Sequence, residues 1–180
     1  MKFFLSAFAA LFLMAQTAKA DLKYAIEAGV RQQSGDTDSA GSTSSQMGLQ
    51  FGATANIQMK DKLHLRTGML YTQRNLTIDG SPDNKVELSY LDIPVTLMYM
   101  FEEYAGVFLG VNLALNLDKK SSQGSVTGLE SQLLPLVLGA SFKFHPDFGV
   151  SIYYENASGK VADGLKDYRA VGANLLITFD

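Results

Sequence analysis

The alternation of apolar and polar residues is the feature that most restricts the fold of this chain. In the stretch 47–59, the residues Met47, Leu49, Phe51, Ala53, Ala55, Ile57 and Met59 alternate with Gly48, Gln50, Gly52, Thr54, Asn56 and Gln58. Successive side chains of an extended strand point to opposite faces, so this pattern predicts a two-faced strand. Eight segments show it: 22–33, 47–59, 63–76, 90–101, 104–117, 132–144, 148–156 and 168–179. We therefore expect an all-β chain.

The connections between these segments alternate in length. The stretches 60–62, 101–103 and 145–147 are short and charged, whereas 34–46, 77–85, 118–130 and 157–167 are long and rich in Ser, Gly, Asp and Lys. This rhythm is typical of an up-and-down barrel that carries its variable loops at one end. The sequence thus predicts an eight-stranded antiparallel up-and-down β-barrel.

The first residues have the features of an export signal. Lys2 is followed by an apolar run over 3–15 and by the small-residue triplet Ala18-Lys19-Ala20. We predict a cleaved secretory signal peptide over 1–20 and one barrel domain over 21–180. The apolar run is shorter than the roughly 20 residues of a spanning helix, and no later stretch reaches that length. Only a closed barrel could therefore carry the mature chain across a membrane.

The composition excludes several classes of partner. The chain has 15 Lys and Arg against 18 Asp and Glu, which argues against nucleic acid as a partner. Cysteine is absent, so no disulfide can form. Because metal, nucleotide and redox motifs are all missing, we expect no cofactor.

Glycine placement predicts which face of the strands lies inside the barrel. An eight-stranded barrel has room inside only for its own side chains, so the crowded inner face favours small residues. The strand glycines all fall on the mixed polar face: Gly29, Gly48, Gly52, Gly68, Gly106, Gly110, Gly139, Gly149 and Gly172. A soluble ligand-binding barrel would show the reverse, with its apolar face inside. The mixed face is therefore predicted to line the lumen and the apolar face to meet lipid.

The same inner face carries charges of both signs, which we expect to pair in a narrow lumen. The predicted lumen charge network consists of Glu27, Arg31, Arg66, Arg74, Asp92, Lys143 and Glu155. Within it, Arg66 on the neighbouring strand is a possible partner of Asp92. Pro94 lies two residues further on, and since proline cannot donate a ladder hydrogen bond, we expect a local bulge there.

Aromatic residues are expected at the two membrane interfaces. With the amino terminus in the periplasm, the short-turn end holds Tyr24, Tyr99, Phe101, Phe144, Phe148 and Phe179, and Tyr71 and Tyr154 lie toward the long-loop end. The general preference of aromatic residues for strands is the simpler alternative.

The segment Tyr90-Leu91-Asp92-Ile93-Pro94-Val95-Thr96-Leu97-Met98-Tyr99 resembles a Y-L-E-I-P-L-L-L-K-Y strand of the PorT-like, porin-family outer-membrane β-barrel domain. The stretches 149–156 and 171–179 are similar to the closing hairpin of that family. The resemblance implies an eight-stranded barrel in the outer membrane, inserted by the barrel-assembly machinery. This chain departs from the pattern with Asp92 in place of glutamate and with Asp180 after the terminal aromatic Phe179.

Function is less constrained than fold. The two histidines, His64 and His145, both fall at the predicted periplasmic end, whereas an enzyme acting on outer-leaflet lipid would need its catalytic pair near the long loops. We therefore expect no enzyme.

The lumen charges could form a plug or line a small pore. The leading expectation is a monomeric outer-membrane protein with a structural or surface-interaction role, in contact with membrane lipid and with an extracellular ligand through its loops. A narrow channel for ions or small solutes is the alternative, and a lipid-modifying enzyme is a remote one.

Overall fold

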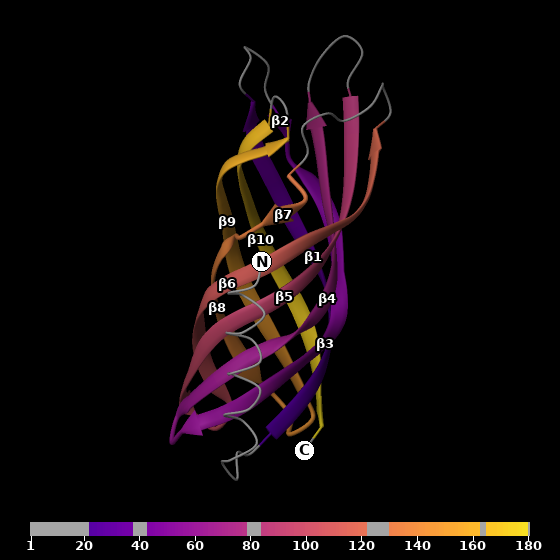
Figure 1. Cartoon of the computed structure of the whole chain (residues 1–180). Coiled ribbons are helices and arrows are strands. Elements are labelled where there is room, and N and C mark those ends of the chain that lie inside the picture. Colours follow the sequence, from indigo (N-terminus) through magenta and orange to yellow (C-terminus); the bar gives the residue numbers. More distant parts are fainter. Residues whose placement is uncertain (1–21, 38–42, 79–83, 122–129, 163–164, 180) are drawn as a thin grey trace.

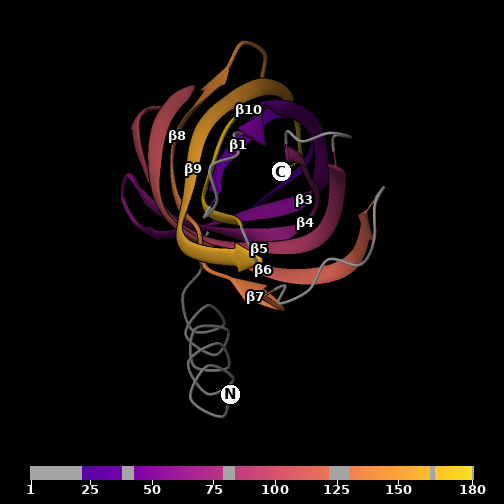
Figure 2. The same cartoon turned by 90° about the horizontal axis from the view of Figure 1, so that it is seen from above.

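The computed structural model is a closed barrel of eight long antiparallel strands (Figures 1 and 2). It describes residues 22–37, 43–78, 84–121, 130–162 and 165–179. The long strands are β1 (Leu22–Thr37), β3 (Gln46–Lys60), β4 (Leu63–Ile78), β5 (Asn84–Glu102), β6 (Ala105–Ser121), β8 (Leu136–Lys143), β9 (Phe148–Ala162) and β10 (Leu165–Phe179). Each pairs with its neighbours in the chain, and β1 pairs with β10 to close the ring. The predicted fold class is confirmed.

Two short strands complete the sheet. The strand β2 (Thr43–Ser44) pairs with the end of β4, and β7 (Gln132–Leu133) pairs with Ala114 and Leu115 of β6. The segment 132–144, predicted as one strand, is therefore divided into β7 and β8. The division falls at Leu134 and Pro135, and because Pro135 has no N–H to donate, it ends the regular ladder at that point.

Several strands extend further toward the long-loop end than the alternation predicted. β5 begins at Asn84 instead of Tyr90, and β4, β6 and β9 continue to Ile78, Ser121 and Ala162. The extra residues pair in regular register, for example Glu87 with Asn75 and with Lys120. The outward side chains of these extra residues are polar. The alternation of apolar and polar residues, on which the sequence prediction depended, is therefore missing there.

The two faces of the strands lie as the glycine argument predicted. On β5, Asp92, Pro94, Thr96 and Met98 are buried in the lumen, whereas Leu97 and Tyr99 are each 51% exposed on the outside. The nine strand glycines share the inward parity, and two of them make room for rings. A Cβ on Gly139 would lie 2.3 Å from the Phe108 ring, and one on Gly172 would lie 2.3 Å from the Tyr153 ring. Glycine at these positions lets bulky side chains cross the narrow lumen.

The bulge expected at Pro94 is absent. Pro94 pairs with Asn112 of β6, and the register between β4 and β5 is the same on both sides of it. Gly68 and Met69 instead interrupt the β4–β5 pairing opposite Pro94 and Ile93. The missing donor of proline is thus accommodated by a local break in the ladder without an inserted residue. Register shifts of β5 occur elsewhere, between Ser89 and Tyr90 and between Met100 and Glu102.

Among the described residues, no helix is long and apolar enough to cross a membrane.

Candidate functional site

The middle of the lumen is crossed by a group of four buried charges. Arg74 of β4 donates both terminal nitrogens to Asp92 of β5, from Nη1 to Oδ1 at 2.9 Å and from Nη2 to Oδ2 at 3.0 Å. The same Nη2 also donates to Oε1 of Glu155 at 2.8 Å, and Arg31 of β1 reaches this oxygen at 2.9 Å. All four side chains have 0% exposure. Two arginines and two carboxylates thus form a neutral cluster, which we call the central ion cluster.

Neutral side chains complete the central ion cluster. Asn112 of β6 donates to Oε2 of Glu155 at 3.0 Å. The hydroxyl of Tyr168 accepts from Arg31 at 2.8 Å and donates to Gln33 at 2.5 Å. The guanidinium of Arg74 lies 4.7 Å from the ring centroid of Tyr90, within the range of a cation–π contact. Strands on all sides of the barrel are therefore joined through one set of polar contacts.

A second buried pair lies nearer the short-turn end. Arg66 of β4 donates to both oxygens of Glu27 on β1, at 2.6 and 2.7 Å. Thr54 donates to Oε1 of Glu27 at 2.6 Å, and Asn174 donates to Oε2 at 3.2 Å. The centroid of the Phe108 ring lies 4.9 Å from the guanidinium carbon of Arg66. This lower ion pair is also neutral, and its carboxylate has several donors.

The structure places the seven predicted lumen charges in three positions. Four form the central ion cluster, and Glu27 with Arg66 forms the lower ion pair. Arg66 is therefore not the partner of Asp92, which bonds to Arg74 instead. Lys143 is half-buried at the short-turn end of β8, where its Nζ lies 3.4 Å from the carbonyl oxygen of Pro146. Six of the seven predicted charges thus lie in two groups, and Lys143 lies near the turn that contains Pro146.

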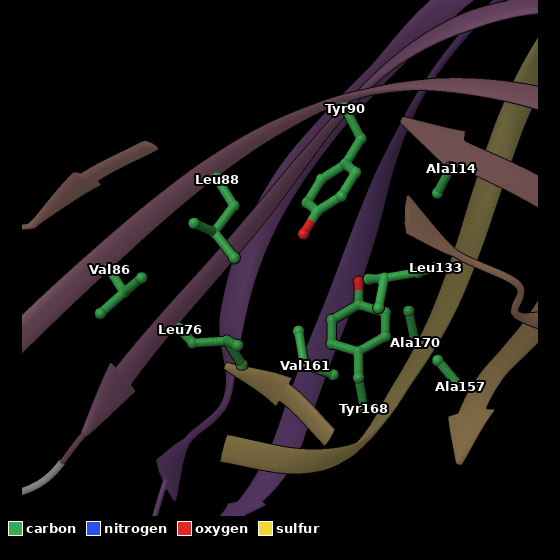
Figure 3. Packing of buried hydrophobic residues seen from close by; sticks show 10 residues of the cluster. All are labelled: Leu76, Val86, Leu88, Tyr90, Ala114, Leu133, Ala157, Val161, Tyr168 and Ala170. Carbon is green, nitrogen blue, oxygen red and sulfur yellow. The ribbon is translucent and has the colours of Figure 1, made fainter. Parts of the chain in front are cut away.

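An apolar cluster closes the lumen on the long-loop side of the central ion cluster (Figure 3). It consists of Leu76, Val86, Leu88, Tyr90, Ala114, Leu133, Ala157, Val161, Tyr168 and Ala170. Tyr90 and Tyr168 approach from different strands with their hydroxyl groups directed toward each other. Both tyrosine rings also contact Arg74, so the apolar cluster rests directly on the ions.

The short-turn end of the lumen is open and forms a cavity of about 1310 Å³, which we call the vestibule. Its inner end is formed by the lower ion pair and by Met98 and Phe108, both buried. His64 and His145 line it near the turns, at the end where the sequence placed them. Among the described residues, no group of His, Asp and Glu could hold a metal ion.

Sequence reasoning missed the neutral members of these groups. Tyr168 and Asn112 have the inward parity, but nothing in the pattern distinguishes a tyrosine that bonds to an arginine from one that faces an interface. A search for polar residues on the mixed face of the middle of each strand would have found Asn112, Thr54 and Asn174. Which polar side chains meet in the lumen depends on the register between strands, and the composition of a strand does not reveal that register.

The outer surface of the barrel bears a wide apolar band. Its members include Ile26, Phe51, Met69, Leu109, Leu138, Ile152 and Leu175, each more than half exposed. The aromatic residues predicted at the short-turn border are exposed there: Tyr24, Tyr99, Phe101, Phe144, Phe148 and Phe179. On the long-loop side the outward face becomes polar, with Arg169 bonded to Asp36 at 2.7 Å. An apolar surface of this extent requires lipid around it.

Comparison with protein families agrees with this surface. A model described as "Outer membrane protein beta-barrel domain" matches residues 14–167. The chain belongs to this family. As an outer membrane protein β-barrel domain, it is placed in the outer membrane. No curated protein matches it significantly.

Solved structures similar to this outer membrane protein β-barrel domain share its fold at low sequence identity. The attachment invasion locus protein Ail of Yersinia pestis, solved in complex with the heparin analogue sucrose octasulfate, is 15% identical with a TM-score of 0.55, over 88% of this chain and 99% of its own. Neisserial surface protein A is 18% identical with a TM-score of 0.54, over 90% and 100%. The outer membrane protein OprG of Pseudomonas aeruginosa is 14% identical with a TM-score of 0.54, over 89% and 97%.

Proposed function

We propose that this protein is a closed outer-membrane barrel with a structural or surface-interaction role, exercised through the ends of its strands and the connections at the long-loop side. The central ion cluster is the observation that carries the proposal. It joins β1, β4, β5 and β9 across the lumen, and the apolar cluster lies on top of it. A hydrated ion would have to break several charge-assisted hydrogen bonds to pass.

The orientation is part of the proposal. The short-turn end faces the periplasm, and β1 begins there, so the amino terminus is periplasmic after removal of the signal peptide over 1–20. The resemblance of the segment 90–99 to PorT-like, porin-family barrels supports the same arrangement. The proposed role involves no catalysis, because His64 and His145 both line the vestibule, away from the outer leaflet.

A narrow channel is the second candidate, and one observation favours it. Several buried polar atoms of the lumen have no partner within the described protein, among them Nε and Nη1 of Arg31, the Tyr153 hydroxyl and Oγ1 of Thr96. Buried polar groups of this kind often bind internal water. A chain of such waters is the feature that a conducting lumen would need.

Planar-bilayer conductance separates the two candidates. The refolded mature protein is expected to give no steady current steps, since the central ion cluster and the apolar cluster block the lumen. A variant that weakens both, Arg74→Ser combined with Glu155→Ser and Leu88→Ser, keeps the lumen charge neutral and should allow current. Lys120→Gln, at an exposed position outside the lumen, is the matched control and should stay silent. Steady channels from the unmodified protein would contradict the closed-barrel proposal.

A further inference from the structure

A polar depression lies on the outer surface of the barrel, where β4, β5 and β6 run side by side on the long-loop side. It has a volume of about 200 Å³. The residues that alternate with its lining, such as Thr72, Arg74 and Leu88, are buried in the lumen, so the lining side chains point outward. We call it the outer polar pocket, and it lies between Gln73 and Asn75 of β4, Glu87 and Ser89 of β5, and Asp118 and Lys120 of β6.

The register of the strands places the outer polar pocket at the border of the apolar band. Tyr71 and Leu91 pair in the last apolar row of β4 and β5, and the Tyr71 ring packs on Phe51 with 5.0 Å between centroids. The Tyr71 hydroxyl is hydrogen-bonded to Oγ of Ser89 at 2.8 Å, in the next row. Asn75 lies four residues beyond Tyr71, or about 13 Å along the strand. The pocket is therefore at the level of lipid head groups.

The polar groups of the outer polar pocket are only partly used. The backbone N of Leu49 donates to Oε1 of Gln73 at 3.4 Å. Nδ2 of Asn75 donates to the carbonyl oxygen of Met47 at 2.9 Å. These bonds orient both amides, and within the described residues they leave Nε2 of Gln73 and Oδ1 of Asn75 without a partner. The carboxylate of Glu87 makes no bond to a described residue either, so the pocket offers both donors and acceptors to a ligand.

The charges of the outer polar pocket nearly cancel. Glu87 and Asp118 lie opposite or beside Lys120, whose Nζ is 3.8 Å from Oδ2 of Asp118. Lys85 lies one row further along β5. A phosphate group would meet two carboxylates here, and a metal ion would meet an ammonium group. The pocket therefore suits an uncharged ligand that is rich in hydroxyl groups.

We propose that the outer polar pocket binds the sugar head group of a glycolipid, with the sugar above Tyr71 and its hydroxyl groups on Gln73, Asn75 and Glu87. Sugar hydroxyls donate and accept, which matches the amides and the carboxylate. At about 200 Å³ the pocket is smaller than the roughly 300–1,000 Å³ of sites for drug-sized molecules, so it suits a single sugar unit. The acyl chains would continue onto the apolar band, which favours a membrane lipid over a free sugar. The proposal goes beyond the surface role, because it concerns the wall of the barrel and holds whether or not the lumen conducts.

Side-chain amide NMR of the isotope-labelled mature barrel in phosphatidylcholine nanodiscs tests the proposal. Gln73 and Asn75 report the pocket, and Gln32, exposed on β1 beside Met47, reports general contact with head groups. Monoglucosyl or monogalactosyl diacylglycerol should shift the Gln73 and Asn75 signals saturably and leave Gln32 unshifted. Diacylglycerol, which lacks the sugar, should shift none of them, and methyl glucoside in the buffer should not reach saturation at the same total concentration. Both leaflets of the nanodisc contain the glycolipid, so the result does not depend on the orientation of the barrel in cells.

Variants identify the site. Ser89→Leu fills the floor of the pocket and should abolish saturation. Glu87→Gln keeps the shape but loses the charged acceptor, and should weaken binding about tenfold. Asp36→Asn changes an exposed carboxylate of β1, outside the pocket, and should leave the titration unchanged. The proposal would be overturned if neither glycolipid shifted Gln73 and Asn75, if diacylglycerol shifted them equally, or if methyl glucoside alone did so.

Discussion

At the residue scale, Glu155 is the acceptor on which the central ion cluster depends. Its Oε1 receives Arg31 and Arg74, and its Oε2 receives Asn112. Each arginine has further contacts, but Glu155 is the carboxylate that both share. Removing its charge therefore leaves two buried guanidinium groups with Asp92 as the one remaining carboxylate of the central ion cluster.

Replacing Glu155 with Gln is expected to lower the free energy of unfolding by about 3–5 kcal/mol, because an uncompensated positive charge remains buried. Urea titration of the protein folded in lipid vesicles, followed by circular dichroism, measures the change. Glu87→Gln alters an exposed carboxylate on β5 and should stay within about 0.5 kcal/mol of the unmodified protein. A similarly small effect for Glu155→Gln would show that the cluster contributes little to stability.

At the scale of elements, the regular pairing between β6 and β9 is interrupted on the long-loop side of β8. β8 ends its pairing at Leu136, opposite Val111 and Asn156. Above that level the residues 130–135 fill the gap, held by β7 and by single bonds from Asn112 N to Pro135 O, Asn116 N to Ser131 O and Glu130 N to Val161 O. Leu133 is 7% exposed in the apolar cluster.

Leu133→Ala is expected to cost about 2–5 kcal/mol, because it empties part of the apolar cluster that surrounds the side chain. The neighbouring Leu134 points outward and is 56% exposed, so Leu134→Ala should cost no more than about 1 kcal/mol. The same urea titration compares them. If the two substitutions had equal effects, the segment 130–135 would not anchor the wall through Leu133.

At the scale of the whole molecule, the barrel changes character along its axis. From the short turns upward, the lumen passes through the vestibule, the lower ion pair, the central ion cluster and the apolar cluster. On the outside the apolar band gives way to a polar surface on the long-loop side. The ends of the molecule are therefore chemically different, and the proposed orientation follows from that difference.

Single cysteines test the orientation, because the chain contains none of its own. A membrane-impermeant maleimide should label Ser158→Cys, exposed on the upper part of β9, in intact cells. Glu103→Cys, in the turn between β5 and β6, should react only after the outer membrane is disrupted. Leu97→Cys lies on the apolar band and should remain unlabelled in both conditions. Labelling of Glu103→Cys on intact cells would reverse the proposed orientation.

The sequence predicted the strands and their faces because side-chain parity is a local property. It could not choose the partner of Asp92, because that choice depends on the stagger between strands. Asp92 lies opposite Leu70, and Arg66 and Arg74 are each four residues from Leu70 in opposite directions along β4. Arg66 is instead bonded to Glu27, which lies on a third strand, and this contact is visible only in the closed barrel. The division of the sixth predicted strand at Pro135 could not be predicted either. The sequence shows the proline, but not which residue of the neighbouring strand lies opposite it.

The central ion cluster also bears on the order in which the barrel assembles. Arg31 lies 124 residues before Glu155, and 137 before Tyr168, so its partners are supplied by β9 and β10 at the end of the chain. An arginine at the bilayer midplane without a partner costs about 2–4 kcal/mol. A partly assembled sheet without β9 and β10 would leave Arg31 without Glu155 and Tyr168, whereas Arg74 would still have Asp92 of β5. We therefore expect insertion to be favoured once the last hairpin, β9 and β10, supplies the partners of Arg31.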